Sequence, residues 1–361
     1  MTALPKWADV ALIPAINLVL AFFVSGLIVM WIGENPLDAM TVMIKGSIGS
    51  AYGWGYTLYY ATNFIFTGLA VAIAFHARLF NIGGEGQAAI GGIGAALVCL
   101  HFGWPHWTLA FPAAIVGAAA FGAAWAAIPA YLQASRGSHI VITTIMFNFI
   151  ASALLVYLLV NVMKAPGQMA PESRGFPAEA HLPTAHEMLA WIGVSFPRSP
   201  PVNVSLLIAF AASALVWVLI WRTRLGYAIR AMGWSEPAAI YAGIRPFRII
   251  MITMMISGGL AGLMAINTVM GEAERLLLDP VQGAGFVGIA VALMGRSHPV
   301  GVVLAAILFG MLYQGGVELE FEMPAVSREM VLVIQALVIL FTGALENMVR
   351  APLERIALMF R

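Results

Sequence analysis

The sequence predicts an all-α protein that crosses a membrane several times. Of its 361 residues, 61% are hydrophobic and only 10% are charged, whereas roughly a quarter of the residues of soluble domains are charged. Apolar runs close to the length that spans a bilayer, about 20 residues, recur along the chain. They lie near 10–32, 56–76, 105–132, 140–163, 203–221, 249–270, 299–317 and 329–347.

Two shorter apolar runs, near 86–101 and 283–295, are rich in glycine. With them the sequence predicts about ten membrane segments, some short or broken. The first run, 10–32, follows Lys6 and exceeds the length of a signal-peptide core, so we expect a retained membrane helix. Because no soluble domain interrupts the runs, residues 1–361 are expected to form a single transmembrane domain.

The charges are distributed unevenly although the formal net charge is only +1. If the N-terminus is inside and the segments alternate, the cytoplasmic parts hold twelve of the 18 basic residues and five of the 17 acids. The basic residues are Lys6, Arg78, Arg136, Arg222, Arg224, Arg230, Arg245, Arg248, Arg296, Arg350, Arg355 and Arg361, and the acids are Asp9, Glu85, Glu236, Glu346 and Glu354. The positive-inside rule therefore predicts that both termini are cytoplasmic.

The segment 222–248 is a polar island between two apolar runs. It carries five arginines and a single acid, Glu236, so the same rule makes it a cytoplasmic loop. Alanines and glycines recur through 226–243, which indicates short helices with a smooth surface that another protein can approach closely.

Three polar segments are expected on the opposite face. The segment 164–202 is rich in proline and ends in a short amphipathic stretch, HEMLAWIG, so we expect an external loop with a surface helix. The segments 271–282 and 318–329 are acidic. Such loops suit contact with a soluble partner, although solvated acidic turns would have the same composition.

The stretch FNIGGEGQ at 80–87 has the most unusual composition in the chain. Its candidate residues are Asn81, Gly83, Gly84, Glu85, Gly86 and Gln87. The glycines permit a tight turn, and a carboxylate at the following helix start is stabilised by the helix dipole by roughly 0.3–1 kcal/mol. Either a broken helix at a gate or partner contact, or a well-capped and closely packed helix start, fits this pattern.

A weaker version of the same pattern occurs at 281–295, where VQGAGFVG also enters a short apolar helix. Matching interrupted segments in two halves are typical of transport pathways built from repeats. A dinucleotide-binding loop is excluded for 80–94, because no strand precedes the glycines.

Uncharged polar residues inside the apolar runs are candidates for a substrate pathway. They are Asn63, Thr143, Thr144, Asn148 and Asn267. The same side chains are what hydrogen bonds between helices require, since an unsatisfied polar group in hydrocarbon is costly. No acidic residue is placed in mid-helix, which argues against a proton- or sodium-coupled site.

The sequence offers no catalytic or metal-binding constellation. Cys99 is the only cysteine, and neither an HExxH motif nor a phosphate-binding GxxxxGK[ST] loop occurs. We therefore expect no catalytic residue, metal or cofactor in this chain, and no nucleic-acid partner. If transport is driven by ATP, ATP and Mg²⁺ must be bound by another polypeptide.

Four stretches resemble signature segments of a known family. They are LFNIGGEGQAAIGG at 79–92, QASRGSHIVITTIMFNFIA at 133–151, RLGYAIRAMGWSEPAAIYAGI at 224–244 and GFVGIAVALMGRSHPVG at 285–301. They are similar to permeases of bacterial ABC importers of the ribose, branched-chain amino acid and nucleoside group. Within it they look most like nucleoside permeases that accompany basic-membrane-protein-type lipoproteins.

The resemblance implies a permease subunit in the bacterial inner membrane. Its implied partners are a second permease, identical or different, two ATPase subunits and an external substrate-binding lipoprotein. The family pattern RAxGxxxxAAxxAGI forms cytoplasmic coupling helices that contact the ATPase. Matching residues here are Arg230, Ala231, Gly233, Ala238, Ala239, Ala242, Gly243 and Ile244; Glu236 lies between them and is a further candidate for contact with the ATPase. Ser138 and His139 depart from the Asn-Glu that relatives often carry.

The leading hypothesis is therefore an ATP-driven importer subunit for nucleosides. Within the same class, a simple sugar or a free nucleobase remains open as cargo. A secondary transporter or channel that acts alone is a third hypothesis, and the missing membrane carboxylates argue against it. An intramembrane enzyme is the weakest alternative, for want of a catalytic set.

Overall fold

The computed structural model describes residues 12–341, which are built from helices and loops. Within that range the one β-type pairing is an isolated antiparallel bridge between Thr184 and Asn203. The predicted all-α class is thus confirmed. Seven charged residues counted above, Lys6, Asp9, Glu346, Arg350, Glu354, Arg355 and Arg361, lie outside the described residues, as does the beginning of the run 10–32.

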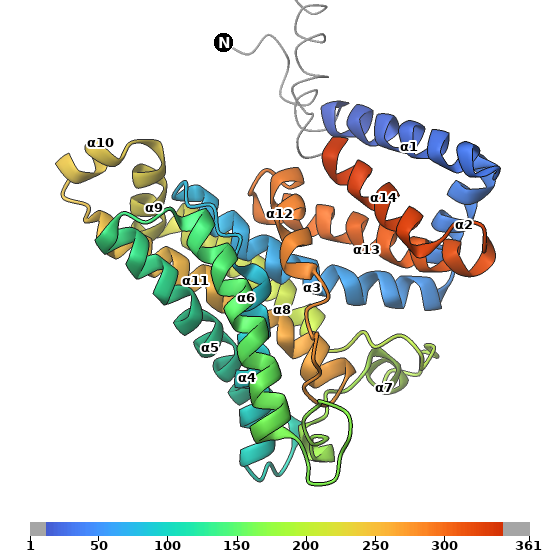
Figure 1. Ribbon diagram of the computed structural model, residues 1–361, viewed down its shortest axis with the longest axis horizontal. Helices are drawn as coiled ribbons and strands as arrows, with labels where there is room; N and C mark the ends of the chain where they lie inside the picture. Colours follow the sequence, from blue (N-terminus) through green and yellow to red (C-terminus); the bar gives the residue numbers. More distant parts are fainter. Residues whose placement is uncertain (1–11, 342–361) are drawn as a thin grey trace, which may run out of the picture. The chain divides into compact units, whose positions relative to one another are not determined.

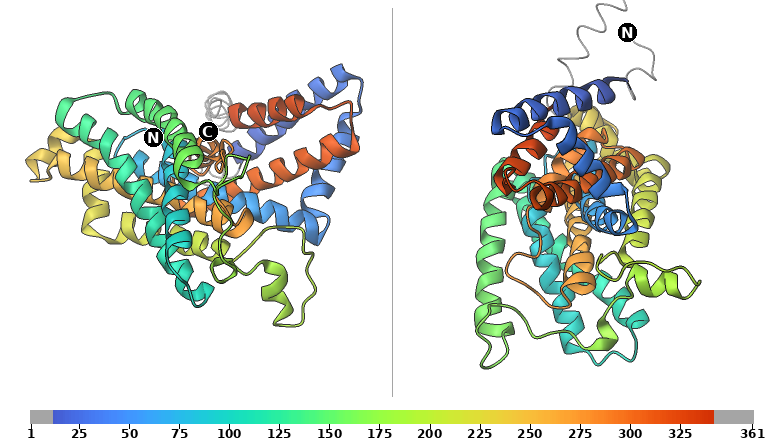
Figure 2. Two further views of the ribbon diagram at one scale, coloured as in Figure 1. Left: turned by 60° about the horizontal axis from the view of Figure 1, so that its bottom comes forward. Right: turned by 90° about the vertical axis from the view of Figure 1, so that its right-hand side faces the viewer.

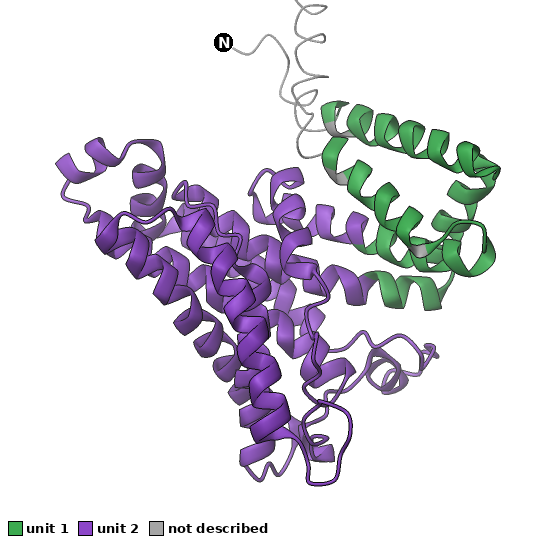
Figure 3. Cartoon of the chain, in the orientation of Figure 1, with its two compact units in different colours: residues 1–57, 310–361 green, residues 58–309 purple. Residues whose placement is uncertain are grey.

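Packing divides the chain into two compact units (Figure 3). Unit 1 comprises residues 1–57 and 310–361, and unit 2 comprises residues 58–309. Helices α3 (Ala51–His76) and α13 (Pro299–Glu322) each contribute residues to both units. The expected single domain over 1–361 remains a prediction.

Unit 1 contains α1 (Ile13–Ile32), α2 (Pro36–Ile48), α14 (Arg328–Ile339) and the adjoining parts of α3 and α13. Gly33 ends α1 in the left-handed conformation, with φ of 98°, which a glycine adopts without steric cost. Asn35 then starts α2 by accepting a hydrogen bond from the backbone N–H of Leu37 (3.0 Å). The sequence did not predict α2, because its residues form no continuous apolar run.

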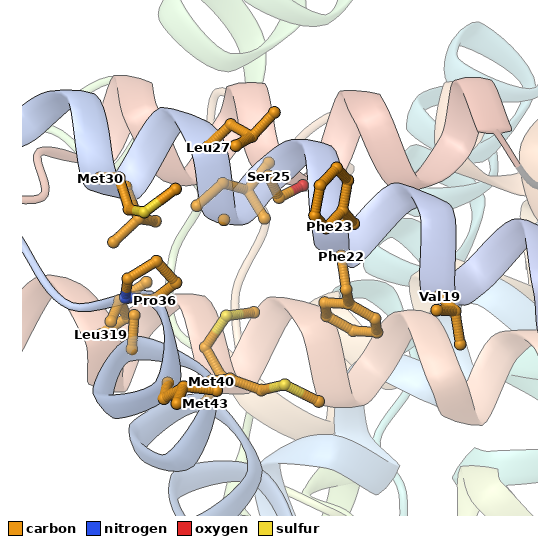
Figure 4. Close-up of a pocket in the computed structure, with 15 residues that line it drawn as sticks. Val19, Phe22, Phe23, Ser25, Leu27, Met30, Pro36, Met40, Met43 and Leu319 are labelled. Atoms are coloured by element: carbon orange, nitrogen blue, oxygen red, sulfur yellow. The ribbon is translucent and has the colours of Figure 1, made fainter.

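Aliphatic side chains of α1, α2, α13 and α14, among them Met43, Leu319 and Val331, form the core of unit 1. Beside it, an apolar cavity of about 400 Å³ lies between α1 and α2 and reaches Leu319 and Ile334 (Figure 4). Ser25 supplies the one hydroxyl among its lining residues, and this hydroxyl has no hydrogen-bond partner among the described residues.

Unit 2 is organised around α11 (Pro246–Ala265), which packs against α5 (Trp107–Arg136) and α4 (Gly84–His101) (Figure 1). Glycines allow the three backbones to approach closely. A Cβ atom at Gly262 would collide with the carbonyl of Ala118 in α5, and one at Gly91 would lie 2.5 Å from the Cα of Gly262. Small residues at such crossings are typical of helix packing in membranes.

Parts of α3 and α13 and six further helices complete unit 2, which Figure 2 shows from two other sides. The six helices are α6 (Ile140–Leu158), α7 (Ala185–Ala190), α8 (Ser205–Arg222), α9 (Arg224–Trp234), α10 (Glu236–Tyr241) and α12 (Ala284–Met294). The π-helical turns Leu159–Met163 and Ile266–Glu272 lengthen α6 and α11, respectively.

Seven helices in the described range are long and apolar enough to cross a membrane. They correspond to seven of the predicted runs, and α4 and α12 are the predicted short glycine-rich segments. The last predicted run, 329–347, is helical as α14 up to Ile339, and residues from 342 onward lie outside the described range. The protein is therefore a multi-pass membrane protein.

The helices of unit 2 have two distinct ends. Asn63 in α3 bonds Asn267 beyond α11, and Ser205 at the start of α8 bonds the same residue. At the other end of these helices, His76 stacks edge-on against Trp221. The residues Arg78, Arg136, Arg222, Arg224, Arg230, Arg245, Arg248 and Arg296 all belong to this second end, which we call the arginine end. Their predicted grouping is confirmed, but the side of the membrane they face remains a prediction.

The opposite end, which we call the loop end, carries the segments 164–202 and 273–283. These are tied together, because the backbone N–H of Ser173 donates to the carbonyl of Leu276 (2.9 Å) and Arg275 pairs with Glu172 (2.9 Å). The predicted surface helix is present as α7, with Glu187 accepting from the backbone N–H of Thr184 (3.0 Å). The segments 164–202 and 271–282 thus lie on one face, as expected. The third segment, 318–329, belongs to unit 1, and its position on the same face remains a prediction.

Candidate functional site

The chain turns back into unit 2 after α3, so that α4 begins in the interior. Asn81 is the centre of this turn and has 1% exposure. Its Oδ1 accepts from the Gly83 N–H (2.9 Å) and from Gln87 Nε2 (3.1 Å). Its Nδ2 donates to Gln87 Oε1 (2.9 Å) and to Ser257 Oγ (2.8 Å). The amide therefore uses its full hydrogen-bonding capacity.

Two further contacts fix the depth at which α4 begins. The hydroxyl of Ser257 in α11 donates to the carbonyl of Ala70 in α3 (2.6 Å). Asn148, in the middle of α6, accepts from the N–H of Gly86 (2.9 Å) and donates to the carbonyl of Ile82 (2.9 Å). Helix α4 thus starts level with the interior of three neighbouring helices rather than at an end of unit 2. The prediction that Glu85 belongs to the cytoplasmic loops is therefore wrong, because the chain turns inward before α4 begins.

Helix α12 begins at the same place. The carboxylate of Glu85 accepts the N–H of Gly283 and the N–H of Gly285, both at 2.8 Å. A Cβ atom at Gly285 would lie 2.5 Å from the Cα of Glu85, so the two backbones are in close contact. The carboxylate occupies the N-terminus of α12, where unpaired N–H groups and the helix dipole favour negative charge.

From this meeting point the two helices run in opposite directions. In α4, Gly91 lies against Gly262, and Gly92 lies near Val269 and Leu276 of the loop end. In α12, Gly288 lies against Thr67 of α3. Beyond the end of α12, the carbonyl of Ser297 accepts from His76 Nε2 (3.0 Å) at the arginine end. The glycine-rich starts that echo each other in the sequence are therefore the N-termini of two half-helices, and a true duplication remains a prediction.

Glu85 is held without a cation in the described part of the chain. The ion pairs found there join His181 to Glu274 and Arg275 to Glu172. A buried carboxylate that lacks a cation needs hydrogen bonds to remain charged. Its two backbone donors come from the other half-helix, so Glu85 joins the two starts directly.

The polar candidates in the apolar runs are mostly bonded within the chain. Asn267 is fully buried, and its Nδ2 donates to Asn63 Oδ1 (2.8 Å) and to the carbonyl of Tyr59 (3.1 Å). Its Oδ1 accepts from Asn203 Nδ2 and Ser205 Oγ, both at 2.9 Å. Sequence reasoning missed Asn203 and Ser205, although both are polar residues at the start of the predicted run 203–221.

The threonine candidates differ in burial. Thr144 is fully buried and its hydroxyl donates to the carbonyl of Ile140 (2.8 Å). Thr143 is half-buried and donates to the same carbonyl (3.0 Å). The structure places Thr144 and Asn148 next to the start of α4, because a Cβ at Gly83 would lie 3.2 Å from Thr144 and one at Gly86 would lie 2.9 Å from the Cα of Asn148. That these residues contact a substrate remains a prediction.

The polar island forms two short helices, α9 and α10, beyond the start of α11 (Figure 1). Thr223 starts α9 by accepting from the N–H of Gly226 (3.0 Å). Ser235 separates the two helices, and Gly243, with φ of 81°, ends α10. A Cβ at Gly233 would collide with the carbonyl of His76, so α9 rests directly on the end of α3.

The predicted coupling residues divide into a packed set and an open set. Gly233 and Ala239 are buried, and Arg230, Ala231 and Ile244 are half-buried. Glu236, Ala238, Ala242 and Gly243 are exposed. Beside the open set, Trp234 and Tyr241 are 81% and 97% exposed. Large exposed aromatic side chains among arginines are typical of protein interfaces.

Comparison with known proteins identifies the family. Residues 54–343 match the family described as the permease component of branched-chain amino acid transport systems. The chain is 34% identical to the glucose ABC transporter permease TsgB13 of Haloferax volcanii, covering 91% of this chain and 86% of that protein.

Two further relatives are named for the transport of other substrates. The guanosine ABC transporter permease NupP of Bacillus subtilis is 34% identical, with 92% of this chain and 93% of that one covered. The ribose import permease RbsC of Escherichia coli is 27% identical over 65% of this chain and 68% of that one. No solved structure matches. The chain therefore belongs to the family of ABC-transporter permease components.

Proposed function

We propose that this chain is the membrane subunit of an ATP-driven importer for nucleosides in the plasma membrane. The observation that carries the proposal is the segment 222–248. Its helices α9 and α10 lie on the end of α3, and four of its five arginines are exposed. Two relatives at 30% identity or more are named for guanosine or nucleoside transport, and the matches cover about nine-tenths of this chain. The earlier resemblance to bacterial inner-membrane permeases points to the same compartment.

In this proposal the arginine end faces the cytoplasm and α9–α10 binds a separate ATPase subunit, which holds ATP and Mg²⁺. Close packing of Gly233 on His76 supports a role in coupling, because a push on α9 is transmitted to α3 without an intervening side chain. A second permease subunit, identical or different, would complete the pathway. An external binding protein would deliver substrate at the loop end.

The paired half-helices are the proposed gate. Opening a path between α4 and α12 requires Glu85 to release the N–H groups of Gly283 and Gly285, which it holds at 2.8 Å. Asn81 and Gln87 would then keep the start of α4 anchored to α11. Asn63, Thr143, Thr144, Asn148 and Asn267 are the proposed polar lining in the open state.

A sugar is the second candidate cargo, because the relative from Haloferax volcanii is a glucose permease at 34% identity. The decisive experiment is uptake in proteoliposomes that contain this chain, its partner permease, the ATPase and the binding protein. Labelled guanosine and labelled glucose are compared with and without ATP. We expect ATP-dependent uptake of guanosine; uptake of glucose alone would overturn the nucleoside assignment, and uptake without ATP would overturn the importer class.

A further inference from the structure

A cavity of about 380 Å³, lined by arginine and aromatic side chains, lies at the arginine end of unit 2. Three segments line it: the end of α3 and the turn that follows it, the end of α8, and α9. The lining residues are Phe75, His76, Arg78, Trp221, Arg230, Gly233 and Trp234. Two guanidinium groups and three large aromatic rings thus share one cavity, and its lining residues include no acid.

The positive charge of this cavity is not neutralised within the described part of the chain. Neither Arg78 nor Arg230 forms an ion pair there. The Nε atom of Arg230 is buried and has no hydrogen-bond partner among the described residues. A buried donor without an acceptor is costly, so the Arg230 guanidinium is not fully satisfied within the chain, and an anion close to it would stabilise it.

The backbone at Arg78, beside this cavity, has an unusual conformation. Arg78 adopts a φ of 54°, a conformation that side chains other than glycine rarely take and that often accompanies functional sites. The turn is held by the N–H of Leu79, which donates to the carbonyl of Ala74 (3.0 Å).

The position of the cavity relative to the ends of the apolar helices indicates which kind of ligand it can accept. His76 is the last residue of the apolar helix α3, and Trp221 is the last but one of α8. The ends of apolar spans lie at the headgroup level of a bilayer, where tryptophan rings concentrate. Basic pockets at this level accept anionic headgroups, and guanidinium groups match the geometry of phosphate oxygens.

We propose that this cavity binds the phosphate of an anionic phospholipid, with Arg78 and Arg230 as its ligands and Trp221 and Trp234 as its walls. A carboxylate of the ATPase subunit is the main competitor, because α9 also belongs to the proposed coupling surface. The bilayer depth of the cavity favours the lipid. The proposal concerns this chain alone and does not depend on the identity of the transported substrate.

The test measures lipid binding to the purified chain in detergent by native mass spectrometry. Short-chain phosphatidylglycerol and phosphatidylcholine are titrated separately, and inorganic phosphate is added as a competitor. The variants are Arg78→Gln, Arg78→Lys and Arg230→Gln, and Arg248→Gln is the matched control because Arg248 is exposed and does not line the cavity. Thermal unfolding checks that each variant is folded.

We expect phosphatidylglycerol to bind more tightly than phosphatidylcholine. Arg78→Gln and Arg230→Gln should each weaken the binding of phosphatidylglycerol by roughly tenfold, which is the effect of losing one charge-assisted hydrogen bond. Arg78→Lys should retain most binding, and Arg248→Gln should match the unmodified chain. Equal loss in Arg78→Gln and Arg248→Gln would mean nonspecific attraction and would overturn the site.

Two other results would also overturn the proposal. Displacement of the lipid by inorganic phosphate at the same concentration would make the cavity a site for free phosphate. If Arg78→Gln leaves lipid binding intact but releases the ATPase subunit from the assembled transporter, the occupant is a protein carboxylate.

Discussion

Replacing Glu85 by glutamine tests the contact between the two half-helices. The side chain keeps its size, but one carboxylate oxygen becomes an NH₂ group that faces the N–H of Gly283 or Gly285, each now held at 2.8 Å. One charge-assisted hydrogen bond is therefore lost, which is worth about 1.5–3 kcal/mol. Removing a buried charge offsets part of that loss, so we expect a net local cost of about 1–2 kcal/mol.

The cost should appear as faster opening of the start of α12. When opening and closing are fast compared with the exchange step itself, a loss of about 1.4 kcal/mol in local stability raises the amide exchange rate about tenfold. Hydrogen exchange of a peptide covering 281–287, followed by mass spectrometry in nanodiscs, measures it. Glu236→Gln is the matched control, because Glu236 is exposed on α10. Unchanged exchange of the Gly283 and Gly285 amides in Glu85→Gln would refute the contact.

Two further predictions concern the packing of unit 2. Asn267→Leu removes the partner of four polar groups at once, so it should lower the free energy of unfolding by about 3 kcal/mol or more, measured by thermal unfolding in detergent; a loss below about 1 kcal/mol would show that these bonds contribute little. Gly262→Val should prevent α5 and α11 from closing, because even a Cβ meets the carbonyl of Ala118, and should abolish recovery of folded protein in size-exclusion chromatography. Gly103→Val, in open space, should be recovered normally, and equal recovery of both variants would contradict the packing.

Much of the fold was predictable because a bilayer imposes a minimum length and apolarity on each span. The runs that became α3, α5 and α11 satisfy that constraint without reference to any other part of the chain. The grouping of the arginines of 222–248 with Arg78 and Arg136 was predictable from charge, because the positive-inside rule applies to all loops on one side of the membrane. Helix α2 escaped prediction because it forms no continuous apolar run, and its packing against α13, where a Cβ at Gly315 would meet the backbone of Met43, is not visible in the sequence.

The candidate site was predictable only in part. The glycines and Glu85 predicted a tight turn followed by a charged helix start, but left open whether this was a broken helix at a gate or a well-capped, closely packed helix start. The partner of Glu85 was not predictable, because Gly283 lies 198 positions away in the sequence. The same holds for Asn267, whose partners come from α3, from Asn203 and from Ser205, the first residue of α8.

The central claim is that α9–α10 couples an ATPase to the membrane helices, and Gly233→Trp tests it most directly. The indole would force α9 away from the carbonyl of His76, so the contact between α9 and α3 would be lost while the spans remain intact. ATP hydrolysis and substrate uptake are measured in proteoliposomes containing the assembled transporter, with Gly103→Trp as the control at an open position. We predict that Gly233→Trp is inserted normally but loses substrate-stimulated hydrolysis and uptake, whereas Gly103→Trp keeps both. Full retention of both activities in Gly233→Trp would contradict the coupling role of α9–α10.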